Sequence, residues 1–300
     1  MSATVLLKNI EDFCHAVLHT ENILGMNRRN LEFVYGHNDR RDFPLADDKL
    51  RTKEAMMKVD VPVPRTYRVY RNFFELKGLK EDLAPFEDFV IKPAQGRAGS
   101  GIIVITGKEA QGWLGPSNRR YGLEELRRHI ADILFGAHSQ DQADRVIIEE
   151  RIRQHPQMEL LSPLGLADVR LILFHNEPLL AMSRIPTRNS GGRANLHQGA
   201  VGVSVDLDSG LTRSAVFNRR PAGHHPDTGA ALLGRQIPCW EEVVRLGIRA
   251  ADALPLKYLG VDISIAEGGP VLLEVNARPG LEIQNVSGTG LKRLLEKRQA

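Results

Sequence analysis

Residues 258–280, YLGVDISIAEGGPVLLEVNARPG, constrain the fold of this chain more than any other stretch. Two runs of β-forming residues flank Glu-Gly-Gly-Pro at 267–270, which predicts two antiparallel strands joined by a tight turn. Polar residues interrupt both runs: Asp262 lies in the first, and Glu274 and Asn276 lie in the second. A domain that contains this hairpin must bury apolar side chains while it also accommodates these polar groups.

The polar side chains of the second strand share one face, because side chains alternate between the two faces of a strand. Glu274 and Asn276 lie on that face, and Arg278 continues the pattern. A register centred on the turn places Asp262 opposite Val275, diagonal to Glu274 and Asn276. We therefore expect the oxygen atoms of the three side chains to converge on one spot.

Two interpretations of this convergence are open. Two carboxylates that approach each other in a half-buried setting repel strongly unless a positive charge lies between them. A divalent cation would supply that charge, and Mg²⁺ commonly binds one or two carboxylates together with phosphate oxygens. Salt bridges from each acid to a nearby arginine would supply it equally well. The spacing of the residues does not decide between them.

A second motif combines a lysine with a glycine-rich loop. Lys92 follows the apolar strand 89–91, and residues 95–101 read QGRAGSG. Glycines let backbone N–H groups approach an anion closely, and a lysine beside them is a suitable phosphate partner. The segment matches neither a Walker loop nor a Rossmann glycine motif. Taken alone, it is also compatible with an ordinary surface turn.

The periodicity of the remaining chain predicts a mixture of helices and antiparallel hairpins, which indicates the α+β class. The predicted elements are a strand–loop–strand unit at 89–105, helices at 121–137, 239–254 and 291–298, a strand at 145–152, and hairpins at 167–185, 200–217 and 258–280.

Composition excludes several classes of protein. The 300 residues are 42% hydrophobic and 26% charged, as in ordinary soluble globular proteins. The net charge of +3 mildly favours anionic ligands and does not indicate a nucleic-acid partner. Cys14 and Cys239 form no disulfide framework, and no apolar run approaches the roughly 20 residues of a membrane span. Because Glu11 and Asp12 interrupt the N-terminal apolar stretch, we expect no signal peptide and a cytoplasmic location.

An ordered series of motifs between about residues 47 and 295 resembles the ATP-grasp ligases, most closely the RimK-like (α-L-glutamate ligase-like) branch. Each motif is modest, but their order and spacing together are specific. The motifs are DKLRTK, VPVP, VIKP with its glycine-rich loop, IIEERI, DVRLILF, NLHQG, GVDIS and LLEVNARPG. The resemblance implies an α+β ATP-grasp fold, in which two α+β lobes grip ATP between antiparallel sheets.

The resemblance also implies a division of the chain. Residues 1–47 would form a short helical N-terminal extension, residues 48–153 the small lobe with the glycine-rich loop, and residues 154–300 the C-terminal lobe with a metal site. RimK-like ligases usually carry a longer N-terminal domain, which often helps to shape the acceptor pocket. Fewer than 50 residues precede DKLRTK here, so the identity of the acceptor stays open.

The site residues that the resemblance implies fall into four groups. ATP would contact two phosphate-binding lysines, the glycine-rich loop and a hinge segment beside adenine and ribose: Lys49, Lys92, Gly96, Gly99, Ser100, Gly101, Glu149, Glu150 and Ile152. The ligands of Mg²⁺, with Mn²⁺ as an alternative, would be Asp262, Glu274 and Asn276. The arginines that face the transferring phosphate or the acceptor carboxylate would be Arg170, Arg184 and Arg278. A substrate loop would contribute Arg193, Asn195 and His197.

The function that the resemblance implies is ATP-dependent joining of a carboxylate to an amine through an acyl phosphate. The substrate would be an amino acid or a peptide-like molecule, with glutamate among the candidates. Two alternatives stay open: a small-molecule phosphotransferase on the same fold, and a nucleotide-binding partner protein without catalysis. Homo-oligomerisation is also left open.

Overall fold

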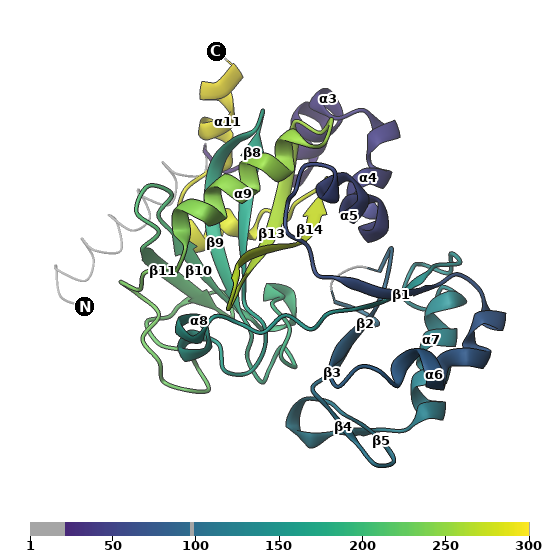
Figure 1. Ribbon diagram of the computed structural model, residues 1–300. Helices are drawn as coiled ribbons and strands as arrows, with labels where there is room; N and C mark the ends of the chain where they lie inside the picture. The colour runs from purple at the N-terminus through teal and green to yellow at the C-terminus, as the bar shows by residue number, and fades with distance from the viewer. Residues whose placement is uncertain (1–21, 97–98, 300) are drawn as a thin grey trace.

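Two separate hydrophobic cores divide the chain into two lobes (Figure 1). The computed structural model describes residues 22–96 and 99–299. The small-lobe core is built around Tyr70, Phe89 and Ile130, and the large-lobe core around Leu171, Val261 and neighbouring strand residues. Both lobes combine antiparallel sheets with helices, so the α+β prediction is confirmed.

The small lobe is a four-stranded antiparallel sheet with helices packed against it and a smaller sheet beside it (Figure 1). Leu126, Ile130 and Ile133 recur at helical spacing and are buried, which explains how the longest helix of this lobe, α7, packs onto the sheet. In spatial order, the sheet contains β1 (Thr66–Tyr70), β7 (Val146–Glu149), β2 (Phe89–Pro93) and β3 (Ile103–Ile105). The other elements are η3 (Phe73–Gly78), α6 (Leu79–Leu83), β4 (Gly107–Glu109), β5 (Gly112–Leu114), η4 (Pro116–Asn118), β6 (Arg120–Tyr121) and α7 (Leu123–Leu134).

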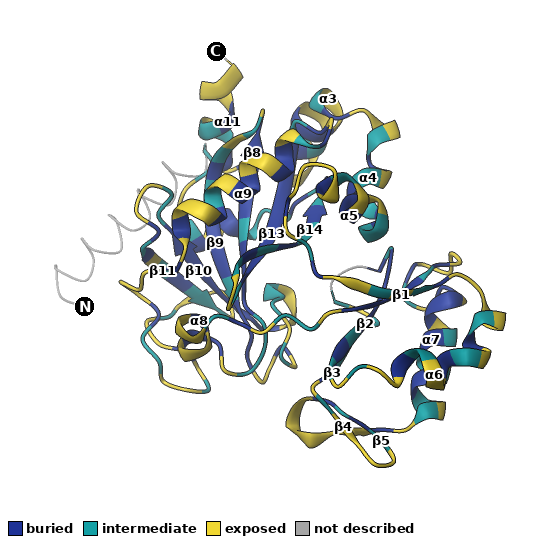
Figure 2. Cartoon of the chain, viewed as in Figure 1, coloured by how far each residue is buried: buried dark blue, intermediate teal, exposed yellow. Residues whose placement is uncertain are grey.

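The large lobe contains a seven-stranded antiparallel sheet whose central strands are buried (Figure 2). In spatial order, its strands are β12 (Arg220–Pro221), β11 (Thr212–Phe217), β10 (Val201–Val205), β9 (Glu177–Ile185), β8 (Asp168–Phe174), β13 (Tyr258–Ala266) and β14 (Gly269–Asn276). The other elements are α8 (Pro156–Leu161), η5 (Leu196–Gln198), α9 (Trp240–Asp252), α10 (Glu282–Ser287) and α11 (Leu291–Gln299).

Helix α9 covers one face of this sheet at very close range. A Cβ atom built on Gly247 of α9 would lie 2.5 Å from a methyl carbon of Leu171 and 3.4 Å from one of Val261. Leu171 and Val261 therefore point toward α9. Their chain neighbours Arg170 and Asp262 point to the opposite face, because side chains alternate along a strand. That opposite face carries the candidate site.

The hairpin at the C-terminal end of the sheet is present, but its register differs from the sequence-based prediction. Asp262 lies opposite Glu274 rather than Val275, because the strands pair around a turn of only two residues, Glu267 and Gly268, and the pairing then shifts by one residue between Asp262 and Ile263. A bulge of this kind adds one residue to one strand and changes every pair beyond it. It places the two carboxylates directly across from each other.

Residues 22–64 pack on the large lobe, although the sequence-based boundary at residue 48 assigns their last part to the small lobe. Phe33, Met56 and Val61 belong to the large-lobe core. The helical elements of this segment are α2 (Met26–Arg28), η1 (Arg29–Val34), α3 (Tyr35–His37), η2 (Arg40–Asp42), α4 (Pro44–Asp47) and α5 (Lys49–Met57). The packing therefore places the boundary near residue 65.

The chain enters and leaves the small lobe through two adjacent segments. The Glu150 N–H donates to the Arg65 carbonyl over 2.8 Å, and the Arg65 N–H donates to the Glu150 carboxylate over 3.1 Å. The first and last strands of the lobe, β1 and β7, are paired neighbours that begin and end beside this contact.

No helix in residues 22–96 and 99–299 is long and apolar enough to cross a bilayer. Cys239 is exposed and free, whereas Cys14 lies outside the described residues.

Candidate functional site

Strand pairing gathers charged side chains on the face of the large sheet opposite α9. Asp262 of β13 lies between Arg170 of β8 and Glu274 of β14 in the register, and paired residues point to the same face. On β8, Asp168 precedes Arg170 by two positions and lies opposite Arg184 of β9. Local alternation and strand order together produce this charged row.

Asp262 is the centre of a buried network of ion pairs. The Arg170 guanidinium binds both of its carboxylate oxygens, with N···O distances of 2.7 and 2.6 Å. One Arg184 nitrogen, Nη2, also reaches Asp262 Oδ2 at 2.8 Å. Only 1% of the Asp262 side chain is exposed, so these pairs are shielded from water. The salt-bridge interpretation of Asp262 is therefore realised in this structure.

Arg184 has a second carboxylate partner. Asp168 binds its Nε and Nη2 atoms over 2.7 and 2.5 Å. Two guanidinium and two carboxylate groups thus form a closed set, which we call the arginine–aspartate quartet: Asp168, Arg170, Arg184 and Asp262.

The quartet shifts the pKa of its members in opposite directions. Burial raises the pKa of Asp262, but the charges of Arg170 and Arg184 outweigh burial and hold that pKa well below its ordinary range. Burial also raises the pKa of Asp168, to about 6. Burial lowers the pKa of Arg184, and the charges of Asp168 and Asp262 more than reverse this effect. The network therefore favours the ionised form of Asp262.

Glu274 and Asn276 converge on Asp262, as the sequence analysis predicts. Asn276 Nδ2 lies 3.2 Å from Asp262 Oδ2 and 3.2 Å from Glu274 Oε1. Two carboxylates and an amide provide the hard oxygen donors that Mg²⁺ prefers, and so their chemistry fits this metal. The amide nitrogen faces the acids in this arrangement, and Asn276 would have to present its oxygen to a metal. Among the described residues, no cluster of three or more His, Cys, Asp or Glu side chains forms a metal site of another type.

A second charged cluster lies where α5 meets strands β2 and β7. Lys92 and Lys53 each bind one carboxylate oxygen of Glu149 at 2.5 Å. Lys53 also donates to the Pro64 carbonyl over 2.7 Å and to Thr66 Oγ1 over 2.9 Å. The Glu149 side chain therefore neutralises lysines, whereas its sequence-predicted position is beside adenine and ribose.

Lys49 extends this cluster toward the Asp262–Glu274–Asn276 trio, which is the candidate metal site. Its Nζ donates to the Gly96 carbonyl over 2.7 Å and lies 4.0 Å from Glu274 Oε2. Burial lowers its pKa, Glu274 opposes that effect, and the charge of Lys92 adds to it. Burial also lowers the pKa of Lys53. We call Lys49, Lys53, Lys92 and Glu149 the lysine cluster; it carries three lysines and one carboxylate.

The described residues of the glycine-rich loop contact side chains of both lobes. Gly99 and Gly101 adopt φ values of +73° and +74°, which non-glycine residues rarely adopt. His129 Nε2 lies 2.9 Å from the Gly101 carbonyl, and His138 Nδ1 lies 3.0 Å from Ser100 Oγ. Two histidines of the small lobe therefore anchor the end of the loop.

The large lobe approaches the same loop through residues 188–198. A Cβ atom on Gly99 would lie 3.2 Å from Cδ of Arg193, so the Arg193 side chain lies against the glycine-rich loop. Asn195 instead accepts from the backbone N–H of His197 over 3.0 Å. Among the described residues, no hydrogen bond or ion pair joins the His197 side chain to the site.

Arg278 lies at the edge of the trio and binds Asp47 of α4. Its guanidinium carbon also lies 4.7 Å from the ring centroid of Phe43, within cation–π range. Glu150 is at the crossing between the lobes, and Ile152 is half-buried just after it.

Sequence reasoning missed two residues that the structure places in these clusters. Lys53 follows Lys49 by four positions, the spacing that puts two side chains on one helix face. Asp168 precedes Arg170 by two positions on one strand, the spacing that puts both on one sheet face. Both spacings are visible in the sequence. They indicate a site only once the structure shows that Lys53 pairs with Glu149 and that Asp168 pairs with Arg184.

A family model described as "Sugar-transfer associated ATP-grasp" matches residues 28–300. The chain belongs to this ATP-grasp family. The match covers both lobes and every predicted site residue, and it confirms the recognition of an ATP-grasp protein that was made from the ordered motifs.

Curated relatives of this ATP-grasp chain carry the name "Probable alpha-L-glutamate ligase", which confirms the RimK-like resemblance. The protein from Halorhodospira halophila is 24% identical over 259 residues, covering 85% of this chain and 63% of the relative. The protein from Saccharophagus degradans is 25% identical over 252 residues, covering 83% of this chain and 61% of the relative. The chain thus spans little more than six-tenths of the length of these relatives.

Solved ATP-grasp structures are also similar at low identity. The ATP-grasp ligase PsnB complexed with a minimal precursor gives a TM-score of 0.47 at 17% identity, covering 88% of this chain and 63% of PsnB. D-alanine–D-alanine ligase from Bacillus anthracis complexed with ATP gives 0.46 at 16% identity, covering 84% of this chain and 65% of that ligase.

Proposed function

We propose that this ATP-grasp protein is an ATP-dependent carboxylate–amine ligase that acts on an amino acid or a peptide-like substrate. One observation carries the proposal: Lys49 joins the lysine cluster and the glycine-rich loop to the Asp262–Glu274–Asn276 trio, through Gly96 at 2.7 Å and Glu274 at 4.0 Å. The proposed phosphate site and the proposed metal site would therefore lie side by side. The names of the curated relatives support the choice of a ligase.

The lysines would neutralise the triphosphate of ATP and the carboxylate substrate, which repel each other. Lys92 and Lys49 are held by buried contacts, so little reorganisation precedes binding. The glycine-rich loop would cover the phosphates and exclude water from the acyl phosphate that forms when the carboxylate attacks the γ-phosphate. The amine then attacks the acyl carbon, and phosphate leaves.

Asp262, Glu274 and Asn276 would hold Mg²⁺, which supplies positive charge to phosphate oxygens when it is bound. Arg278 is close to this trio and is exposed enough to exchange Asp47 for a substrate carboxylate or for phosphate oxygens, since 29% of its side chain is accessible. A guanidinium suits both anions because it forms forked pairs of hydrogen bonds.

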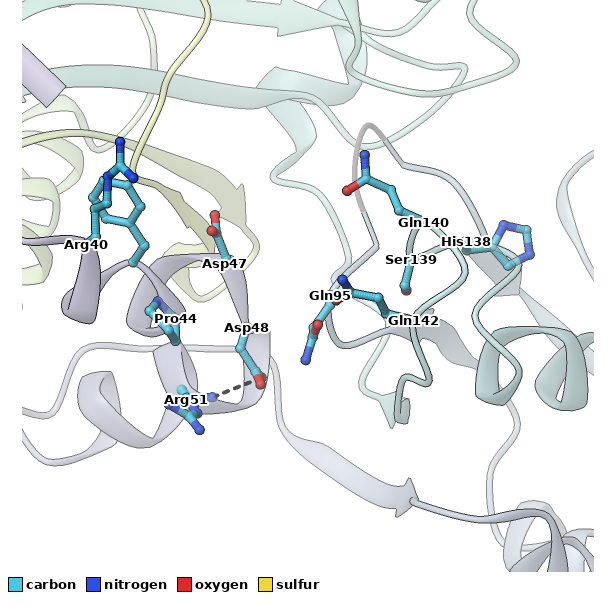
Figure 3. Close-up of a pocket in the computed structure, with 11 residues that line it drawn as sticks. Arg40, Pro44, Asp47, Asp48, Arg51, Gln95, His138, Ser139, Gln140 and Gln142 are labelled. Carbon is cyan, nitrogen blue, oxygen red and sulfur yellow. Dashed lines mark hydrogen bonds between the residues drawn. The ribbon is translucent and has the colours of Figure 1, made fainter. Parts of the chain in front are cut away.

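We place the peptide-like substrate in the pocket between α4–α5 and the loop 138–142 (Figure 3). The pocket has a volume of about 590 Å³ and borders the reacting centre through Asp47, the partner of Arg278. The side chains of Gln95, Gln140 and Gln142 line the small-lobe wall, and they face Asp47 and Asp48 across the gap (Figure 3). Amide groups both donate and accept hydrogen bonds, as recognition of a peptide backbone requires.

Product analysis tests this proposal. The purified protein is incubated with Mg²⁺, ATP and pools of amino acids and short peptides, and ADP, phosphate and new masses are measured. Free phosphate with a product heavier by an amide-linked residue supports the ligase. A stable phosphorylated product would identify a phosphotransferase instead. ATP binding without turnover on any acceptor would favour a nucleotide-binding partner protein and contradict the proposal.

The pocket has its own test, since Gln140→Ala removes one wall amide and leaves the charged clusters intact. We expect KM for the accepted peptide to rise about five- to tenfold, the cost of one hydrogen bond, while KM for ATP stays the same. The matched control is Gln157→Ala, which changes an exposed glutamine of α8 outside the pocket. An unchanged KM for the peptide would exclude this pocket as the substrate-binding site.

A further inference from the structure

Asp168 is the one member of the arginine–aspartate quartet that contacts none of the proposed metal ligands directly. Its two oxygens bind Arg184 over 2.7 and 2.5 Å, and 6% of its side chain is exposed. Arg184 Nη2 is shared, because it also lies 2.8 Å from Asp262. The two carboxylates therefore compete for one guanidinium.

This competition affects how readily the Asp262 carboxylate could bind a metal ion. Arg170 and Arg184 together contact both oxygens of Asp262, and the Asn276 amide adds a third contact. A cation can share this carboxylate only to the extent that the guanidinium groups release it. Among the described residues, Asp168 is the only other carboxylate that holds Arg184.

We infer that Asp168 is a positioning residue that draws Arg184 away from Asp262 and thereby sets the metal affinity of the Asp262–Glu274–Asn276 trio. The inference rests on the proposed function, because it takes Asp262 as a metal ligand. It assigns to Asp168 a role that the sequence motifs do not.

Removing the charge of Asp168 would act on the trio in two ways. Arg184 would keep Asp262 as its carboxylate partner and would bind it more fully. The site would also gain one net positive charge, which disfavours a divalent cation. Changes to groups that orient metal ligands typically cost about 10- to 100-fold in metal affinity.

The test measures binding of Mn²⁺ alone, by the loss of its free EPR signal, to the full chain without nucleotide. We expect Asp168→Asn to raise the Mn²⁺ dissociation constant about 10- to 100-fold. Asp168→Glu, which retains the charge, should stay much closer to the wild type. The matched control Asp82→Asn removes a carboxylate from Tyr70 and Arg68 in the small lobe and should change nothing.

A double variant separates positioning from a merely structural role. Arg184→Met in the Asp168→Asn background removes the competing guanidinium and should restore Mn²⁺ affinity to the wild-type level or above. A structural role predicts the opposite, since the double variant loses a whole ion pair. Should Asp168→Asn not fold, Arg184→Met alone decides: affinity at or above the wild type supports the inference, and weaker affinity overturns it.

The outcomes distinguish this inference from the metal assignment on which it rests. Wild-type affinity in Asp168→Asn, while Glu274→Gln abolishes binding, overturns the role of Asp168 and leaves the metal site in place. If Glu274→Gln and Asp262→Asn both bind Mn²⁺ as tightly as the wild type, the metal assignment fails and the role of Asp168 fails with it.

Discussion

The lysine cluster and the arginine–aspartate quartet are linked through Glu274 and Asn276 and differ in their balance of charge. The lysine cluster joins three cations to one carboxylate, and its Lys49 borders the carboxylate of Glu274. The quartet joins two cations to two carboxylates, all with bidentate or shared contacts. One cluster has a surplus of positive charge, whereas the other is neutral.

This difference indicates how each cluster meets a ligand. A surplus of positive charge attracts an anion without any loss of existing pairs, so the charge of the lysine cluster suits the proposed phosphate site. A neutral, buried quartet offers a cation no net attraction, and its carboxylates are released only when a guanidinium moves. Under the proposed function, the lysine cluster is therefore preorganised for an anion, whereas the quartet must rearrange before Asp262 binds a cation.

The largest expected effect comes from removing one charge on each side. Lys92→Ala and Glu274→Gln should each lower turnover about 100- to 1000-fold, the usual cost of losing one preorganised charge at a transition state. The measurement is the rate of phosphate release at saturating ATP and acceptor. Circular dichroism and the thermal midpoint serve as controls for folding. Wild-type turnover in Glu274→Gln would refute the metal assignment.

Lys53→Met should affect stability more than ligand binding. All donors of Lys53 are used inside the protein, by Glu149, Thr66 and the Pro64 carbonyl. Because Lys92 still pairs with Glu149, we expect a loss of about 1–3 kcal/mol in the free energy of unfolding, measured by urea denaturation. KM for ATP should change less than about twofold, in contrast to Lys92→Ala. A large rise in KM with unchanged stability would make Lys53 a phosphate ligand.

Ligand-induced stabilisation compares the two clusters in the wild-type protein. ADP without metal should raise the thermal midpoint, whereas Mg²⁺ without nucleotide should raise it less. For ADP at about 100 times its dissociation constant, the gain of about 2.7 kcal/mol corresponds to a shift of several degrees. An equal or larger shift from Mg²⁺ alone would show that the quartet needs no rearrangement.

The smallest effect concerns the anchor of the glycine-rich loop. Burial lowers the pKa of His129, so the unfolded chain binds a proton more readily than the folded chain. The stability that neutral His129 contributes is therefore present above its unfolded pKa, about 6.5, and is lost as the pH falls through the lower folded pKa. Urea midpoints between pH 7.5 and 5 should decline less steeply in His129→Gln than in the wild type. His224→Gln, at an exposed position, is the matched control, and an identical slope in both variants would contradict this role.

Local patterns predicted the strands, the hairpins and the convergence of Asp262, Glu274 and Asn276, because alternation along a strand fixes which side chains share a face. The register was not predictable, since it depends on a bulge beside Asp262 for which the turn sequence gives no signal. The packing of residues 48–64 on the large lobe was missed for a related reason. The apolar residues of that segment form no stripe along α5, and what they pack against is decided by tertiary contacts.

The ion pairs of the quartet could not be predicted from local sequence at all. Arg170 and Asp262 are 92 residues apart, and they meet because β8 lies beside β13 in the sheet. The sequence analysis left a metal and salt bridges as equal interpretations of Asp262. The structure shows the salt bridges. A metal ion could share the same carboxylate only if a guanidinium group released it.

The adjacent crossings at Arg65 and Glu150 make the small lobe an insertion whose two covalent connections to the large lobe lie side by side. A module joined to its host in this way can be exchanged, shortened or borrowed from another protein while the connectivity of the host remains the same. The large lobe contains the charged sheet face and the α4–α5 segment, and the small lobe contains Lys92 and the glycine-rich loop. Under the proposed function, the residues for nucleotide binding on the small lobe and the acidic residues of the large sheet could therefore vary as separate parts.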